Sequence, residues 1–349
     1  MAHEAPGQHQ RRPRYKGTHP RTFQEKYKEL DPERYPEEVE KIAATGRTPA
    51  GSHRPVLVAE ILKVLAPRPG EIAVDATLGY GGHAREILPA LLPGGRLYGL
   101  DVDPRELPKT EARLRAAGFD AHVLRVKRTN FAALPKLLAE EGISGVDLLL
   151  ADLGVSSMQL DDPARGFTFK REGPLDLRMN PEKGRPASQL LATLSRSKLV
   201  DLLRENADET YADPIAEALL ARPGEITTTT ALADAVRGAL AGLPAKERAD
   251  AGDDPVRRTF QALRIAVNEE FSALTAFLSA LPYCLNPGGR VAILSFHSGE
   301  DRRVKHAFKE GQERGDYREI ARFVIRPSLE EVRDNPRSAP AKLRWAIRG

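Results

Sequence analysis

Hydrophobic and polar positions follow two alternating periods along the chain from residue 55 onward. Short apolar runs bounded by turn residues predict buried strands at residues 71–77, 96–100, 121–126 and 146–151. Between these runs, a helical repeat predicts helices at residues 56–65, from the turn at 79–82 to about 92, 103–117 and 131–141. Strands that alternate with helices of this length predict a parallel sheet with helices on both faces.

The alternation stops after Asp152. Residues 160–186 are rich in Gly, Pro and Arg and are expected to form a loop, whereas residues 187–241 have helical periodicity and residues 242–256 are polar and loop-like. A long helix at 260–281 and an apolar strand at 290–294 then resume the first pattern. The sequence thus predicts a sheet domain at residues 51–158 and 257–349, interrupted by a mainly helical insertion at 159–256.

The first 50 residues have little apolar periodicity and are predicted to be a flexible extension with at most one short helix near 36–44. Basic residues gather in the first half of this extension: Arg11, Arg12, Arg14, Lys16, Arg21, Lys26 and Lys28. Acidic residues follow at 29–40. The extension is either a dispensable solvated tail or an arm that binds RNA by neutralising phosphates.

Composition narrows the class of protein. Of 349 residues, 41% are hydrophobic and 29% are charged, which is typical of a globular protein with a core. No apolar run approaches the roughly 20 residues of a membrane span, and the N-terminus lacks the apolar core of a secretory signal. The single cysteine, Cys284, excludes an internal disulfide and a Cys-rich zinc site. We therefore expect a cytoplasmic protein without a membrane partner, and the net charge of +4 tolerates an RNA partner without requiring one.

Three features follow the ends of predicted strands, where open parallel sheets bind their ligands. The glycine-rich loop 75–83 follows the first strand, Asp101 ends the second, and Asp152 ends the fourth. Asp101 lies 22 residues after Gly79, a spacing typical of an acid that binds ribose hydroxyls. Since the third glycine of the dinucleotide motif G-x-G-x-x-G is missing, the loop favours S-adenosylmethionine over NAD.

Seven motifs then resemble one known family in their order and residues: 53–57 (HRPVL), 75–83 (DATLGYGGH), 152–157 (DLGVSS), 165–169 (RGFTF), 175–179 (LDLRM), 260–268 (FQALRIAVN) and 295–298 (SFHS). This chain resembles the RsmH (MraW) family over nearly its whole length beyond the extension. Departures from the family pattern include Tyr80 in place of Gly and Gly299 in place of Leu, with partial matches at 206–209 and at Pro340.

The resemblance implies an α/β fold of the class I methyltransferases, with a Rossmann-like sheet and an inserted helical domain that recognises the substrate. It implies methyl transfer from S-adenosylmethionine to the N4 amine of a cytidine in the decoding centre of bacterial 16S rRNA. Carried over residue by residue, the cofactor contacts would be Gly81, Gly82, His83, Asp101, Phe131, Asp152 and Gln159.

Asp152 and His297 are the predicted catalytic residues. Asp152 is hypothesised to accept a hydrogen bond from the reacting amine, although a purely cofactor-binding or strand-capping role is an equal alternative. His297 follows the strand at 290–294 on the same edge of the sheet, and a structural role is equally open.

Substrate contacts are predicted at Arg165, Phe167, Asp176, Arg178, Ser298 and Arg302. In the alternative interpretation, Phe167 and Phe169 belong to the core of the insertion and Asp176 pairs with Arg178 or Arg165. Two basic runs, at 257–264 and 302–305, either contact phosphates or are solvated helix faces, and the second run is the favoured RNA contact. No cluster has the sequence spacing of a metal site, so no metal is expected.

Three rival functions remain from the residues alone. A DNA amino-methyltransferase would have an Asp/Asn-Pro-Pro-aromatic motif where this chain has Asp152-Leu153-Gly154, so DNA is not expected as a partner. A nicotinamide-dependent dehydrogenase would need the missing glycine. A non-catalytic assembly factor would bind the cofactor without methylating small ribosomal subunits. The sequence leaves the oligomeric state open, a homodimer included.

Overall fold

The computed structural model describes residues 55–222 and 224–349. The predictions for residues 1–50, including the short helix near 36–44, lie outside the described residues.

A seven-stranded sheet forms the larger part of the described chain. Its strands are β1 (Ile72–Asp75), β2 (Arg96–Asp101), β3 (Leu124–Arg128), β4 (Val146–Asp152), β5 (Leu285–Ser295), β6 (Tyr317–Ile320) and β7 (Lys342–Arg348). They are ordered β3-β2-β1-β4-β5-β7-β6. The first five strands pair in parallel, and β7 pairs antiparallel with β5 and with β6.

Helices cover both faces of the sheet because its central strands are apolar on both sides. The sheet domain contains α3 (Val58–Leu65), α4 (Gly82–Leu91), α5 (Leu107–Ala116), α6 (Leu134–Glu140), α14 (Glu270–Cys284), α15 (Ser298–Glu313) and α16 (Leu329–Asp334). One apolar core joins the sheet to α6, α14 and α15, and a second core on the opposite face joins it to α3, α4 and α5. In β4, five of the seven residues are buried.

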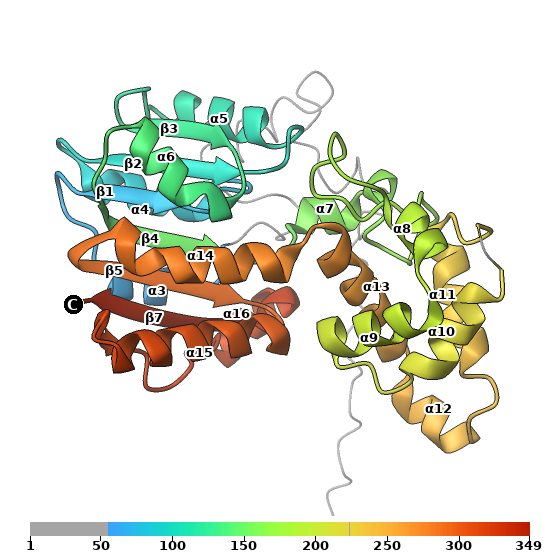
Figure 1. Ribbon diagram of the computed structural model, residues 1–349. Coiled ribbons are helices and arrows are strands. Elements are labelled where there is room, and N and C mark those ends of the chain that lie inside the picture. Colours follow the sequence, from blue (N-terminus) through green and yellow to red (C-terminus); the bar gives the residue numbers. More distant parts are fainter. Residues whose placement is uncertain (1–54, 223) are drawn as a thin grey trace, which may run out of the picture.

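The insertion is a separate bundle beside the sheet (Figure 1). It contains α8 (Ala187–Thr193), α9 (Arg196–Ala207), α10 (Ala212–Leu220), α11 (Thr229–Ala239) and α12 (Ala245–Ala251), preceded by the short α7 (Ser157–Asp161). Its own core includes Leu199, Ile215 and Leu232. The helix α13 (Asp254–Val267) adds Phe260 and Leu263 to that core and leads back to the sheet domain.

The predicted fold class is confirmed: the sheet has the strand order and the antiparallel β7 of a Rossmann-like class I methyltransferase, and a helical insertion interrupts it. Two local predictions were wrong. Residues 242–256 contain α12 and the start of α13 rather than loop alone, and the expected helix 260–281 is divided into α13 and α14. The break lies at Asn268 and Glu269, where Glu269 has a φ of 52° that a continuous helix cannot contain.

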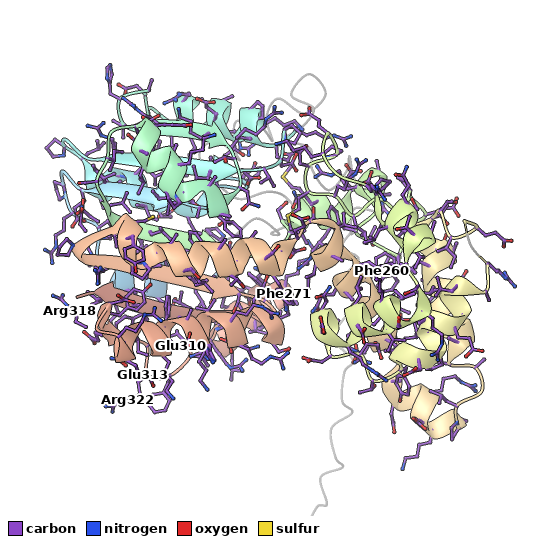
Figure 2. All side chains as sticks on the ribbon, in the orientation of Figure 1. Phe260, Phe271, Glu310, Glu313, Arg318 and Arg322 are labelled. Atoms are coloured by element: carbon purple, nitrogen blue, oxygen red, sulfur yellow. The ribbon has the colours of Figure 1, made fainter. Side chains whose placement is uncertain are left out.

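The parallel strands end facing the insertion, so the loops after β1, β2 and β4 lie at the junction between the two domains (Figure 1). Figure 2 shows the side chains of Phe260 on α13 and Phe271 on α14 near this junction. Among the described helices, none is long and apolar enough to cross a membrane.

Candidate functional site

A cavity of about 810 Å³ lies between the carboxyl ends of the strands and the insertion. It is lined by most of the predicted cofactor and catalytic residues: Gly82, His83, Asp101, Phe131, Asp152, Gln159 and His297. These residues come from positions up to 215 apart in the sequence. They are brought together because the parallel strands β1, β2, β4 and β5 have their carboxyl ends at the same edge of the sheet. The cavity is therefore the candidate site.

The glycine turn between β1 and α4 is held by the acid of the next strand. The backbone N–H of Gly79 donates to Asp101 Oδ2 at 2.8 Å, and that of Asp103 donates to Asp101 Oδ1 at 2.9 Å. Gly81 has a φ of 80°, and a Cβ there would lie 3.0 Å from Thr110 Cγ2. Glycine is required at this position both by its backbone conformation and by its packing against α5.

Burial raises the pKa of Asp101, while the hydrogen bonds from Asp103 and Gly79 lower it. Its carboxylate lines the cavity beside the turn. Asp101 thus shapes the loop and presents acceptor oxygens to a ligand at the same time.

Asp152 ends β4 with one carboxylate oxygen that the described residues leave without a partner. The Oδ1 atom is buried and has no hydrogen bond, and Oδ2 lies 3.5 Å from His83 Nε2. The backbone N–H of Asp152 donates to Thr77 Oγ1 at 2.6 Å, which fixes the strand end against the glycine loop. A buried oxygen without a donor is costly unless a ligand supplies one, so Asp152 is suited to receive an N–H from a bound molecule.

Asp75 is a second carboxyl group at this edge. It is 2% exposed and accepts a hydrogen bond from the backbone N–H of Thr77 at 3.2 Å. Burial raises its pKa from 3.8 to about 7, against the lowering effect of nearby His83, and Asp152 and Asp101 add to the rise. Asp75 does not itself line the cavity; it lies next to Ala76 and Thr77, which do.

We expect the cofactor-free protein to become less stable as the pH rises from about 4 to 7. The folded chain keeps the Asp75 proton up to about pH 7, whereas the unfolded chain releases it near pH 3.8. The contribution of Asp75 to the free energy of unfolding then falls by up to roughly 4 kcal/mol across that range and stays low above it. Urea unfolding at pH 5 and pH 8 measures the difference.

In Asp75→Asn, which cannot ionise, we expect a smaller loss of stability between these pH values and a more stable protein than wild type at pH 8. Asp147→Asn, which alters another acid of the sheet outside the cavity, should keep the wild-type pH dependence. An Asp75→Asn variant with the wild-type slope would contradict the assignment.

Gln159 and Arg165 meet at the buried carboxylate of Asp103. Gln159 Nε2 donates to Asp103 Oδ2 at 2.9 Å, and its Oε1 accepts from the backbone N–H of Ser156 at the start of α7. Arg165 Nη1 lies 2.8 Å from Asp103 Oδ2, with both side chains at least 96% buried. Arg165 was expected to contact RNA, but its guanidinium is buried in this ion pair. The buried pair joins the end of β2 to the first turn of the insertion.

The other predicted substrate residues also have internal partners. Phe167 is 7% exposed and belongs to the core of the insertion, although it also lines the cavity. Arg178 donates to Asp176 through Nε at 2.7 Å and Nη2 at 2.8 Å. These contacts match the alternative interpretation of the sequence, in which Phe167 belongs to the core of the insertion and Asp176 pairs with Arg178.

Ser298 and Arg302 connect α15 to the insertion. Ser298 Oγ donates to Asp208 Oδ2 at 3.1 Å, and Arg302 Nη2 donates to both Asp208 oxygens at 2.9 and 3.0 Å. These contacts are exposed, so they contribute little to stability. An RNA contact of Ser298 and Arg302 stays a prediction.

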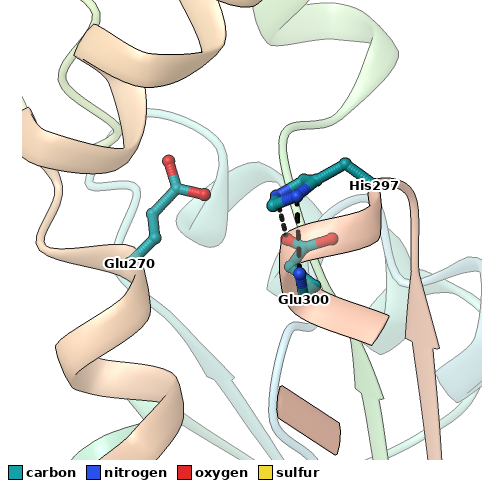
Figure 3. A group of neighbouring side chains, drawn as sticks. All are labelled: Glu270, His297 and Glu300. Carbon is teal, nitrogen blue, oxygen red and sulfur yellow. Dashed lines mark hydrogen bonds and ion pairs between the residues drawn. The ribbon is translucent and has the colours of Figure 1, made fainter. Parts of the chain in front are cut away.

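His297 caps the N-terminus of α15 and faces Glu300. Its Nδ1 accepts from the backbone N–H of Glu300 at 3.4 Å, and its Nε2 lies 3.2 Å from Glu300 Oε1 (Figure 3). Burial acts to raise the pKa of Glu300, but the hydrogen bond with His297, the charge of Arg264 and the hydrogen bond from the backbone N–H of Phe296 together lower it. His297 thus lines the cavity with both ring nitrogens directed at Glu300, and a catalytic role for it stays a prediction.

Sequence reasoning missed several residues of the site. Asp75 lies within the motif 75–83 but was not predicted to have a role, and Asp103 and Glu300 were not predicted as site residues. The ion pair between Arg264 and Glu270 also lines the cavity and was not foreseen, because its partners lie on different helices around the break at residue 268. Glu270 on α14 and the neighbouring pair His297 and Glu300 bring ligand-type atoms within 4.8 Å of one another.

Comparison with known proteins agrees with this geometry. Residues 50–348 match the MraW methylase family. The chain is 52% identical to ribosomal RNA small subunit methyltransferase H 1 of Lachnoclostridium phytofermentans, over 97% of this chain and 93% of that protein. It is 50% identical to ribosomal RNA small subunit methyltransferase H 2 of Alkaliphilus metalliredigens, over 97% of each. A solved rRNA methylase from Streptococcus thermophilus is similar over 83% of this chain and 93% of that one, with 11% identity and a TM-score of 0.39.

Proposed function

The chain belongs to the MraW methylase family and is a methyltransferase, and on this premise we propose that it methylates the N4 amine of a cytidine in the RNA of the small ribosomal subunit, with S-adenosylmethionine as donor. The observation that carries the proposal is the convergence of the glycine turn, Asp101 and Asp152 on one cavity. The relatives named above are called ribosomal RNA small subunit methyltransferases, which supports an rRNA substrate.

The residues of the cavity fit S-adenosylmethionine. Asp101 offers carboxylate oxygens for two ribose hydroxyls, and Phe131, which packs 5.1 Å from Phe277 between ring centroids, can support the adenine ring. Asp152 lines the cavity and its carboxylate complements the positive charge of the donor. Gly82 and His83 begin α4 beside the turn, and Gln159 lines the same wall; we propose all of these, together with Gly81, as the cofactor site.

The bound donor supplies a methyl group already activated by the positive sulfur. What the protein must supply is orientation, since the lone pair of cytosine N4 is delocalised into the ring and N4 is a weak nucleophile. A carboxylate that accepts a hydrogen bond from the amine favours a pyramidal nitrogen and holds it in line with the methyl group. Asp152 lines the cavity and has an oxygen, Oδ1, without a hydrogen-bond donor among the described residues.

Asp152 also takes the proton that the amine loses as the N–C bond forms and the S–C bond breaks. His83 Nε2 lies 3.5 Å from the other oxygen and can share that proton. We assign acceptance of the amine hydrogen bond to Asp152 and a positioning role to His297.

The two domains divide the work in this proposal. Residues 51–158 and 257–349 hold the donor, and the insertion, residues 159–256, recognises the rRNA. The resemblance of the sequence motifs supports a target in the decoding centre of 16S rRNA. The protein would then act in the bacterial cytoplasm, where small subunits are assembled, with neither DNA nor a membrane as a partner.

Radiolabelled methyl transfer tests the proposal. Small ribosomal subunits from a strain without this gene are incubated with the protein and labelled S-adenosylmethionine, and the rRNA is digested to nucleosides. We expect the label in N4-methylcytidine, and no transfer to subunits from a strain that retains the gene. Label in another nucleoside would overturn the N4 assignment, and binding of the donor without transfer would favour an assembly factor.

A further inference from the structure

The half of the cavity farther from the glycine turn has no assigned ligand. It is lined by residues of α13 and α14 and by the end of β5, chiefly Phe260, Gln261, Arg264, Asn268, Glu270 and His297. Under the proposed function, the target base must leave its stack and enter this half to reach the methyl group. The polar groups here would then read the base.

The ion pair of Arg264 with Glu270 is the most rigid polar feature of this wall. Nε donates to Oε1 and Nη2 donates to Oε2, both at 2.8 Å, and the two side chains are 14% and 12% exposed. Asn268 in the break between the two helices holds the pair in place: its Nδ2 donates to the carbonyls of Arg264 and Leu177. The pair is therefore fixed, partly open to the cavity and tied to the insertion.

A metal ion is the first alternative, because Glu270, His297 and Glu300 bring ligand-type atoms within 4.8 Å of one another. Figure 3 shows the carboxylate of Glu270 facing His297 and Glu300. However, both oxygens of Glu270 already accept from Arg264, and Glu300 accepts from the backbone N–H of Phe296 and contacts His297. A guanidinium bonded to one ligand would repel a divalent cation, so a neutral ligand with donor and acceptor groups fits better.

We propose that the Arg264–Glu270 pair reads the Watson–Crick edge of the target cytosine, with Glu270 accepting from N4 and Arg264 donating to N3. This inference rests on the proposed function and assigns its base-recognition site.

The chemistry of a two-pronged ion pair explains the selectivity. Nε and Nη2 each donate one N–H to the carboxylate, to Oε1 and Oε2 respectively. The second N–H of Nη2 and the free lone pair of Oε2 then lie side by side, on the side of the ion pair away from Nε. A donor beside an acceptor is what guanine presents to cytosine. Uracil has an acceptor at position 4 and a donor at N3, so it meets both groups with the wrong polarity. Because N4 keeps one N–H for Glu270, the other can face Asp152 while the lone pair attacks.

Nucleotide binding tests this assignment directly. The protein is saturated with S-adenosylhomocysteine and titrated with cytidine, uridine and 3-deazacytidine 5′-monophosphates, the last of which lacks the N3 acceptor. We expect the wild type to bind the cytidine nucleotide about 10-fold or more tightly than the other two. Glu270→Gln should lose the preference over uridine, since its amide can donate to O4, and Arg264→Lys should lose the preference over 3-deazacytidine.

A matched control is available in the same sheet domain. Arg290 and Glu71 also form a two-pronged ion pair, through Nη1 and Nη2 rather than Nε and Nη2, with both bonds at 2.8 Å and side chains 14% and 16% exposed, at the opposite end of the sheet. Glu71→Gln should keep the wild-type nucleotide preference. With small subunits as substrate, Glu270→Gln should lower kcat/KM by about 10- to 100-fold, with donor affinity changed less than about threefold, and Glu71→Gln should leave both near wild type.

The outcomes separate this inference from the proposed function. A wild type that methylates rRNA but binds the three nucleotides equally, or none of them, overturns the base-reading assignment and leaves the function intact. A wild type that never methylates rRNA overturns the function itself. Titration with Mn²⁺ alone, followed by electron paramagnetic resonance, tests the metal alternative: binding that Glu270→Gln abolishes would assign the cluster to a cation and overturn the proposal.

Discussion

Asp152→Ala is expected to lower the rate of methyl transfer by about 1,000-fold, within the range by which a positioned acid–base group accelerates a reaction. The physical reason is Oδ1, a buried oxygen of a residue that lines the cavity, which the described residues leave without a donor. Without this oxygen nothing holds the N4 amine pyramidal and in line. Single-turnover methylation of small subunits with saturating donor measures the step.

Two further variants distinguish the roles open to Asp152. Asp152→Asn keeps one acceptor oxygen but not the charge, and we expect an intermediate loss of rate. Asp147→Asn alters an acid of the same strand that binds the backbone N–H of Ile72 and the side chain of Asn286, and it should retain normal turnover. If Asp152→Ala kept more than a tenth of the wild-type rate with weakened donor binding, Asp152 would be a cofactor ligand alone.

Asp101→Ala is expected to weaken the binding of S-adenosylmethionine by roughly 100-fold. The carboxylate is proposed to bind the ribose hydroxyls, and hydrogen bonds to a charged group are worth about 1.5–3 kcal/mol each. The substitution also releases the backbone N–H of Gly79 and so loosens the turn that packs against the donor. Isothermal titration calorimetry with the donor measures the change.

Asp120→Ala serves as the control for the loss of loop hydrogen bonds. Asp120 Oδ1 accepts from the backbone N–H groups of His122 and Val123 before β3, and it does not line the cavity. We expect this variant to bind the donor like wild type. If Asp101→Ala and wild type bound S-adenosylmethionine with equal affinity, Asp101 would not belong to the donor site. The argument that the cavity binds the donor would then lose its main support.

The two sites affected by these variants are linked through Asp103. This carboxylate binds Arg165 and Gln159, while the backbone N–H of Asp103 binds Asp101. Breaking a buried ion pair of this kind leaves a charge without a partner and is strongly destabilising. The donor-binding acid and the first turn of the insertion are thus held in one rigid hydrogen-bonded unit, which fixes the two halves of the cavity relative to each other.

Local pattern determined the elements that bury apolar residues regularly. The strand that became β4 is apolar except at Asp147 and its last residue, Asp152, and such a run between turn residues is typical of a strand in the middle of a sheet. The alternation with helices then implies parallel strands whose carboxyl ends share one edge. For that reason, the sequence alone predicts that Gly79, Asp101 and Asp152 lie close together.

The break between α13 and α14 did not follow from local pattern. Residues 260–281 have helical periodicity throughout, and neither proline nor glycine marks the break at residue 268. The bend is stabilised by contacts with a remote segment: Asn268 Oδ1 accepts from the backbone N–H of Met179, and its Nδ2 donates to the carbonyl of Leu177. A helical period carries no information about a partner 90 residues away.

The sequence by itself thus determined the class of fold and the family and predicted the donor-side residues, because each of these depends on short segments whose residue types are constrained locally. Only the tertiary structure decided which polar side chains are available. Arg165 is buried in its ion pair with Asp103, Asp176 pairs with Arg178, and Arg264 pairs with Glu270 in the wall of the cavity. Availability depends on which charges meet across the fold, and burial makes that pairing obligatory.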